Sequence, residues 1–169
     1  MSSQHIVGQA YNAVVTGLAI ISGAIFGLMA VFIGADVLMR NVTGAGLAWV
    51  IELMEYAIYV ATVFAAPWVL REGAHVSVDI ITSTLPRGAA RWVGVVAALL
   101  GSVICFIVFY YSALATWRAF ERGSLVYKSF TVPEWLVTFF VPFGMFFMVI
   151  EFLLLVKARL GRNAVTDSR

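Results

Sequence analysis

The 169-residue sequence contains little charge: 12% of its residues are Asp, Glu, Lys or Arg, whereas 62% are hydrophobic. A water-soluble domain is about half apolar and about a quarter charged. A polar exterior therefore cannot be built around this much apolar material, and the mean hydropathy of +0.97 agrees. The composition excludes a soluble globular domain and predicts a protein whose solvent is lipid.

Cysteine and histidine are also scarce. The single cysteine, Cys105, excludes an intrachain disulfide and a cysteine metal cluster, and two histidines leave little for catalysis or metal binding. Neither histidine lies at helix depth, where a haem would need its axial ligands. The net charge of +2 sits on isolated residues, so nothing favours nucleic-acid binding. We expect no cofactor and no nucleic-acid partner.

Four stretches almost free of charge predict membrane spans, because about 20 apolar residues are needed to cross about 30 Å of hydrocarbon as a helix. The predicted spans cover about 12–37, 46–70, 90–117 and 134–157, followed by a polar tail over 158–169. Membrane strands would alternate apolar and polar residues, which these runs do not. The first span lacks the basic start and short apolar core of a secretory signal, so we expect it to be retained. The expected fold is an all-α integral membrane protein with one four-helix domain.

All five tryptophans fall at the ends of predicted spans, where indole rings prefer the boundary between headgroups and hydrocarbon. We expect Trp68, Trp92, Trp117 and Trp135 to act as boundary anchors, and Trp49 lies at the start of the second span. Orientation follows from the positive residues. With the amino terminus inside, seven lie on the inner side and four on the outer side: Arg71, Arg87, Arg91, Lys157, Arg159, Arg162 and Arg169, against Arg40, Arg118, Arg122 and Lys128. This excess predicts that both termini are cytoplasmic.

Small residues recur every fourth position in three spans and allow helix backbones to approach closely. The stripes are Ala19, Gly23 and Gly27; Ala57, Ala61 and Ala65; and Ala90, Gly94, Ala98 and Ser102. The fourth span instead carries phenylalanine at 139, 140, 143, 146 and 147. We therefore expect the first three spans to pack closely and the fourth to face lipid or a partner. Either internal packing or a partner contact explains a single stripe.

Acidic residues inside spans are costly and are candidates for function. Glu52 and Glu55 share one helix face and have three interpretations: an ion pair between helices, for instance with Arg40, a contact with another subunit, or a proton or cation relay. Asp36 and Arg40 are spaced for a helix-end ion pair. Glu151, near a basic tail, is expected to extend toward the membrane surface without a chemical role.

The connection between the second and third spans is the one loop with a pattern. Gly73 is expected to end the second helix, and the mixed apolar and polar residues after it predict a short segment in the plane of the interface. His75 and Asp79 would be neighbours in that segment. No nucleophile or metal-ligand cluster accompanies them, which favours a structural pair.

No internal repeat, phosphate-binding glycine loop or nucleophile motif is visible in the sequence. The pattern favours a non-enzymatic accessory subunit, with no catalytic, substrate-binding or metal-binding residue.

The run formed by Trp49, Glu52, the segment GAHVSVDI over 73–80 and Leu85-Pro86 resembles the small membrane subunit, the Q or DctQ-like component, of tripartite ATP-independent periplasmic (TRAP) transporters. SFTVPEW over 129–135 and VPFG over 141–144 extend the resemblance to nearly the whole chain. One departure is that a single acid, Glu52, precedes Glu55 where relatives have two adjacent acids followed by a basic residue.

The resemblance implies a bacterial inner-membrane protein that braces a large membrane (M) subunit, which takes up a small organic acid with sodium from a periplasmic solute-binding (P) protein. It implies that Trp49, Glu52 and Glu55, with the stripe Ala19, Gly23 and Gly27, contact the large subunit, and that the His75–Asp79 segment anchors the inner side. Two other functions stay open: an independent homo-oligomeric exporter or proton or cation channel using Glu52 and Glu55, and a membrane anchor for a peripheral enzyme.

Overall fold

The computed structural model describes the backbone of residues 2–82, 87–128 and 131–161, and the side chains of 8–47, 49–73, 89, 92–128 and 131–160. The described chain contains four long helices: α1 (Ser2–Thr43), α2 (Ala48–Thr82), α3 (Arg87–Arg122) and α4 (Glu134–Gly161). Each contains a stretch long and apolar enough to cross a membrane, namely Gly8–Thr43, Trp49–Gly73, Trp92–Arg122 and Glu134–Leu160. The prediction of an all-α, four-helix membrane protein is confirmed.

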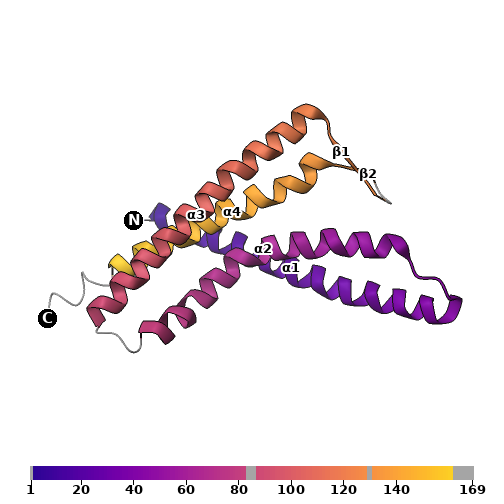
Figure 1. The fold of residues 1–169 in the computed structure, drawn as a ribbon. Coiled ribbons are helices and arrows are strands. Elements are labelled where there is room, and N and C mark those ends of the chain that lie inside the picture. Colours follow the sequence, from indigo (N-terminus) through magenta and orange to yellow (C-terminus); the bar gives the residue numbers. More distant parts are fainter. Residues whose placement is uncertain (1, 83–86, 129–130, 162–169) are drawn as a thin grey trace.

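The helices form two hairpins (Figure 1): α1 packs mainly on α2, and α3 packs along α4. The contact between α2 and α4 joins the two hairpins. α1 begins and α4 ends at the same end of the molecule. α2 changes direction along its length (Figure 1), and it contains Pro67, which removes a backbone hydrogen bond from the helix interior.

The expected close packing of the first three spans is wrong, because α4 packs along α3 and also against α2. The reason is that small residues on one helix receive large residues from another. Phe152 of α4 lies over Gly101 of α3, and the Arg159 side chain crosses Gly94. On the side of α4 that faces α2, the rings of Phe140 and Phe143 contact the ring of Phe64. Some of the phenylalanines that were expected to face lipid or a partner therefore contact another helix of the same chain.

The helix ends differ from expectation at Gly73. α2 continues through this glycine to Thr82, so residues 74–82 extend the second helix. Glycine inside a helix costs only about 1 kcal/mol relative to alanine and does not by itself terminate it. Within the described backbone, the glycines with positive φ are Gly44, at 74°, and Gly123, at 59°, directly after α1 and α3. The Gly44 N–H donates to the Arg40 carbonyl at 3.0 Å, which closes the last turn of α1.

A short antiparallel hairpin, which the sequence did not predict, connects α3 to α4. Its strands are β1 (Leu125–Tyr127) and β2 (Thr131–Pro133), with Val126 opposite Val132.

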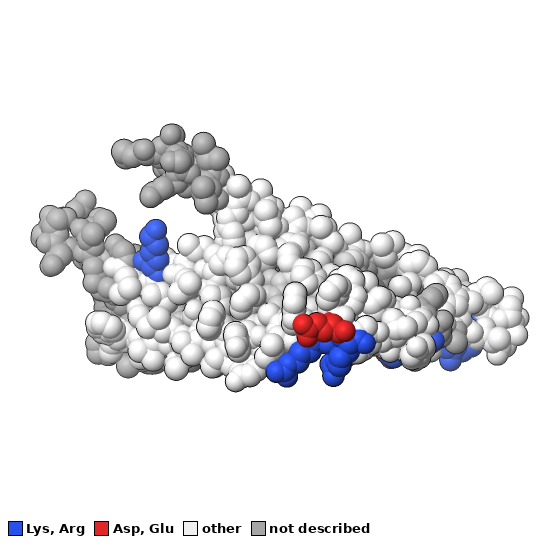
Figure 2. Space-filling view, turned by 90° about the horizontal axis from the view of Figure 1, so that it is seen from above, with Lys and Arg blue, Asp and Glu red and all other residues white. Residues whose placement is uncertain are grey.

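Charged side chains are sparse on the molecular surface. Figure 2 shows a mostly uncharged face on which Lys, Arg, Asp and Glu gather in a few small groups. This distribution suits helices surrounded by hydrocarbon, with charge kept to the membrane boundaries.

Candidate subunit-contact site

One edge of α1 faces the rest of the molecule, and its most buried residues recur every seven positions: Val15, Ser22, Met29 and Asp36. Half-buried residues fall between them, so the full contact edge is Tyr11, Val15, Leu18, Ser22, Ile25, Met29, Phe32 and Asp36. We call these eight residues the α1 seam. Their alternating steps of four and three are the spacing with which one helix packs along another. The seam fixes which side of α1 faces outward.

The predicted stripe Ala19, Gly23 and Gly27 lies beside the seam. Ala19 is half-buried, and Gly23 and Gly27 are exposed. A Cβ added at either glycine would meet no neighbouring atom within 4 Å. The other two stripes contribute to internal packing: Ala61 of α2 is fully buried, and Gly94, Ala98 and Ser102 of α3 are buried. The α1 stripe thus remains on the outer surface of the chain.

Glu52 and Glu55, near the start of α2, lie close to the β-hairpin. Glu55 forms an ion pair with Lys128, which follows β1, rather than with Arg40. The hydrogen bond to Glu55 is the main cause that raises the pKa of Lys128, and the nearby charge of Glu52 adds to it. Lys128 also lies 5.6 Å from the ring centre of Tyr56. These contacts hold the β-hairpin against α2, and the pair itself lies on the surface of the chain.

The expected pair between Asp36 and Arg40 is confirmed, with 3.1 Å between Arg40 Nη2 and Asp36 Oδ2. The other carboxylate oxygen of Asp36 accepts the Leu47 N–H at 2.6 Å. Asp36 therefore connects the end of α1 to the turn that leads into α2.

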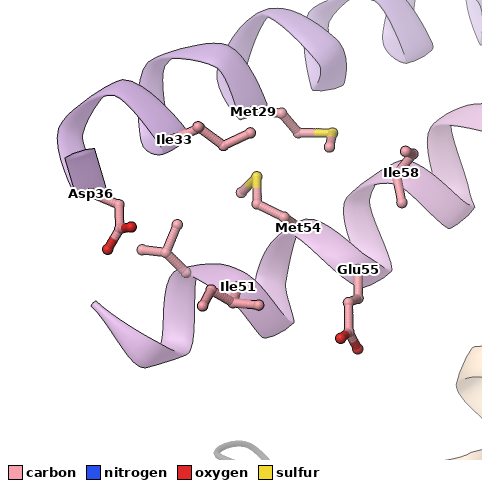
Figure 3. Close-up of a pocket in the computed structure, with 8 residues that line it drawn as sticks. Met29, Ile33, Asp36, Ile51, Met54, Glu55 and Ile58 are labelled. Carbon is pink, nitrogen blue, oxygen red and sulfur yellow. The ribbon is translucent and has the colours of Figure 1, made fainter. Parts of the chain in front are cut away.

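A hollow of about 370 Å³ lies between α1 and α2, close to Glu55. Figure 3 shows Met29 and Ile33 of α1 on one side and Ile51 and Met54 of α2 on the other. The Glu55 carboxylate points away from the two methionines (Figure 3). The hollow is also lined by Asp36, Val50 and Ile58. The lining is dominated by apolar side chains, as expected for a surface in contact with hydrocarbon or with another apolar side chain.

Trp49 is partly exposed at the start of α2, and its ring meets Phe32 edge-on at 6.2 Å between centroids. Trp68, Trp92 and Trp117 are exposed, which is the environment that a boundary anchor requires. Trp135 is half-buried at the start of α4, with its ring 5.8 Å from Phe120. The side chains of His75 and Asp79 lie outside the described residues, and their backbone belongs to α2.

The expectation that Glu151 extends toward the membrane surface is wrong. Its side chain does not extend to the membrane surface but is buried, with 3% of it exposed. Arg71 of α2 donates to Glu151 from two nitrogens, with Nε at 3.0 Å, and Tyr11 of α1 donates its hydroxyl at 3.1 Å. The Arg71 guanidinium also lies over the Tyr11 ring. Tyr11, Arg71 and Glu151 thus form a cluster that joins α1, α2 and α4. A buried carboxylate needs such partners, because they compensate its charge.

The described residues contain no group of three or more His, Cys, Asp or Glu side chains placed to hold a metal ion. What they do contain is four spans, short connections, an interior held by a few polar contacts and an outward face on α1. Residues 29–161 match the family model of the DctQ component of tripartite ATP-independent periplasmic transporters. The chain belongs to the DctQ family.

Among curated proteins, this DctQ chain is similar to the ectoine TRAP transporter small permease protein TeaB of Halomonas elongata. The two are 26% identical over 126 residues, which is 75% of this chain and 65% of the relative. The chain thus matches slightly less than two thirds of that relative's length. Family membership and four spans together make it a multi-pass protein of the inner membrane, in a family of transporter permease subunits.

Proposed function

We propose that this DctQ chain is the non-catalytic small subunit of a TRAP transporter and braces the large membrane subunit. The transporter would take up a small organic acid with sodium, after delivery by a periplasmic binding protein. Ectoine is the solute in the name of the relative TeaB. In the proposed assembly, selectivity resides in the other polypeptides.

The observation that carries the proposal is the unoccupied outer face of α1. Lipid tails are as apolar as leucine, so helices associate in a membrane where small residues permit close backbone contact. Gly23 and Gly27 provide such a surface, with no atom of the described chain near either Cβ position. The comparable stripes on α2 and α3 contain buried residues inside the subunit. A helix of the large subunit is the partner that we assign to this face.

The rest of the proposed contact lies at the two ends of the spans. Trp49, Glu52 and Glu55 would form its outer part, beside the β-hairpin, and the segment from His75 to Asp79 would anchor the inner side. Both termini would then be cytoplasmic. α1 begins and α4 ends on the same side of the bundle, which supports placing the two termini on one side of the membrane.

The test is co-purification of the large subunit with the double variant Gly23→Leu, Gly27→Leu. We expect its recovery to fall by roughly tenfold, since about 1.4 kcal/mol of lost contact suffices for that change. The chain itself should fold, because both positions have free space around them.

A matched control is the double variant Ile21→Phe, Leu28→Phe. Ile21 and Leu28 are exposed on the same helix, about 160° around the axis from Gly23 and about 100° from Gly27, respectively. Added bulk there should leave recovery unchanged. Full recovery and full uptake with the glycine variant, or solute transport by the purified chain alone in vesicles, would contradict the bracing function.

A further inference from the structure

The α1 seam contains three polar residues in an otherwise apolar edge: Tyr11, Ser22 and Asp36. Each makes a defined hydrogen bond to a different partner. The Tyr11 hydroxyl donates to Glu151 of α4, the Ser22 hydroxyl donates to the Ala61 carbonyl of α2 at 2.7 Å, and Asp36 accepts the Leu47 N–H. Tyr11 and Asp36 are 25 positions apart, which is about 38 Å along the helix. The three contacts lie near both ends and in the middle of the membrane-spanning part.

The apolar members of the seam cannot by themselves fix the position of α1. Val15, Leu18, Ile25, Met29 and Phe32 pack against neighbours that hydrocarbon would replace at little cost, because apolar side chains have no solvent to escape in lipid. A slide of one turn, about 5 Å, would bring the apolar residues into equivalent positions. The hydrogen bonds of Tyr11, Ser22 and Asp36 would be lost in that slide. Buried polar residues in helix seams are known to specify one register in this way.

We propose that Tyr11, Ser22 and Asp36 are positioning residues that fix the depth and rotation of α1, and thereby orient the Ala19, Gly23 and Gly27 face toward the large subunit. The orientation of this face toward the large subunit rests on the proposed function, whereas the positioning of α1 does not. α1 packs mainly on α2, so few other contacts constrain its rotation.

The test measures distances by electron paramagnetic resonance in the full chain, in nanodiscs of phosphatidylethanolamine and phosphatidylglycerol. Cys105→Ser removes the native thiol, and spin labels replace exposed Ile20 on α1 and Tyr111 on α3. The variant is Tyr11→Phe, Ser22→Ala, Asp36→Ala. We expect the single distance of the parent protein to broaden or split, with a second population displaced by about 5 Å, the length of one turn.

A second label pair, on Tyr111 of α3 and Leu153 of α4, is the internal reference, since both residues are exposed and these helices pack without the seam. Its distance should not change. If the triple variant loses helicity, the measurement is made on Tyr11→Phe alone, which removes one hydroxyl and retains the ring.

An unchanged α1 to α3 distance in a folded variant would overturn the positioning role. A broadened distance together with loss of the co-purifying large subunit supports the whole proposal. A broadened distance with full recovery of the large subunit supports the positioning role and contradicts the assignment of the α1 face to that partner. The isolated chain and the complex thus report on the two inferences separately.

Discussion

Replacing Glu151 with leucine is expected to lower the free energy of unfolding by about 3 to 5 kcal/mol, as found when one partner of a buried ion pair is removed. The carboxylate is buried and accepts hydrogen bonds from Arg71 and Tyr11. Without it, the half-buried Arg71 guanidinium loses the carboxylate that compensates its charge, and the Tyr11 hydroxyl loses its acceptor. Equilibrium unfolding of the purified chain in mixed micelles measures the effect.

The double variant Arg71→Met, Glu151→Leu separates the cost of an isolated charge from the value of the pair. Well-packed apolar residues can replace a buried pair at little or no cost, so the double variant should be more stable than Glu151→Leu alone. Glu55→Gln provides the surface comparison and should cost clearly less than Glu151→Leu, because the pair with Lys128 is not enclosed by the protein. Equal losses for Glu151→Leu and Glu55→Gln would show that burial does not control the Arg71 pair.

Replacing Gly144 with alanine is the second large expected effect, with a loss of about 1 to 3 kcal/mol from overpacking between α4 and α2. A methyl group at Gly144 would overlap Val63 Cγ1 and lie 3.2 Å from the Val63 carbonyl oxygen. Neither neighbour can move away easily, because valine is stiff at χ1 and the carbonyl belongs to the helix backbone. The same unfolding experiment measures the loss.

Two further variants make this result specific. Gly23→Ala adds the same methyl group where no atom lies within 4 Å, so it should not destabilise the chain. Val63→Ala removes the overlapping methyl group and should restore part of the stability lost in Gly144→Ala. If Gly144→Ala were as stable as Gly23→Ala, the close approach of α4 to α2 at this glycine would be wrong.

The spans were predictable because they follow from local composition. Long runs without charge require helices in a membrane, where backbone groups must be satisfied within the segment. The Asp36–Arg40 pair was predictable for a related reason, since residues four apart on a helix are neighbours whatever the rest of the fold does. Both predictions needed only nearby sequence.

The contacts between helices were not predictable in this way. Glu151 meets Tyr11 across 140 positions and Arg71 across 80 positions, and no spacing within α4 indicates either partner. The stripe rule placed Gly94 on a close-packing surface but did not identify its partner, which is the Arg159 side chain of α4 rather than a residue of α1 or α2. Gly73 was interpreted as a helix end because glycine often follows one, whereas Gly44 and Gly123 have the positive φ that this role uses.

One signal for the α1 seam was present in the sequence. Tyr11, Ser22 and Asp36 are polar residues in an apolar span, and their separations of 11 and 14 match steps of three and four residues. An isolated polar residue in a span generally needs a partner inside the protein. Polarity alone would not have been enough, because Asn12 and Thr16 are also polar and are exposed; the spacing of Tyr11, Ser22 and Asp36 is what indicates the buried edge.

The seven-residue repeat of buried positions in α1 makes the length of this helix as important as its composition. Inserting one residue between Ser22 and Asp36 would rotate everything beyond it by about 100° and turn Asp36 away from the turn that it closes. An insertion of seven residues would preserve the rotation but raise the end of α1 by about 10 Å, far past the start of α2. The number of residues between the polar contacts of this helix is therefore constrained together with the identity of those contacts.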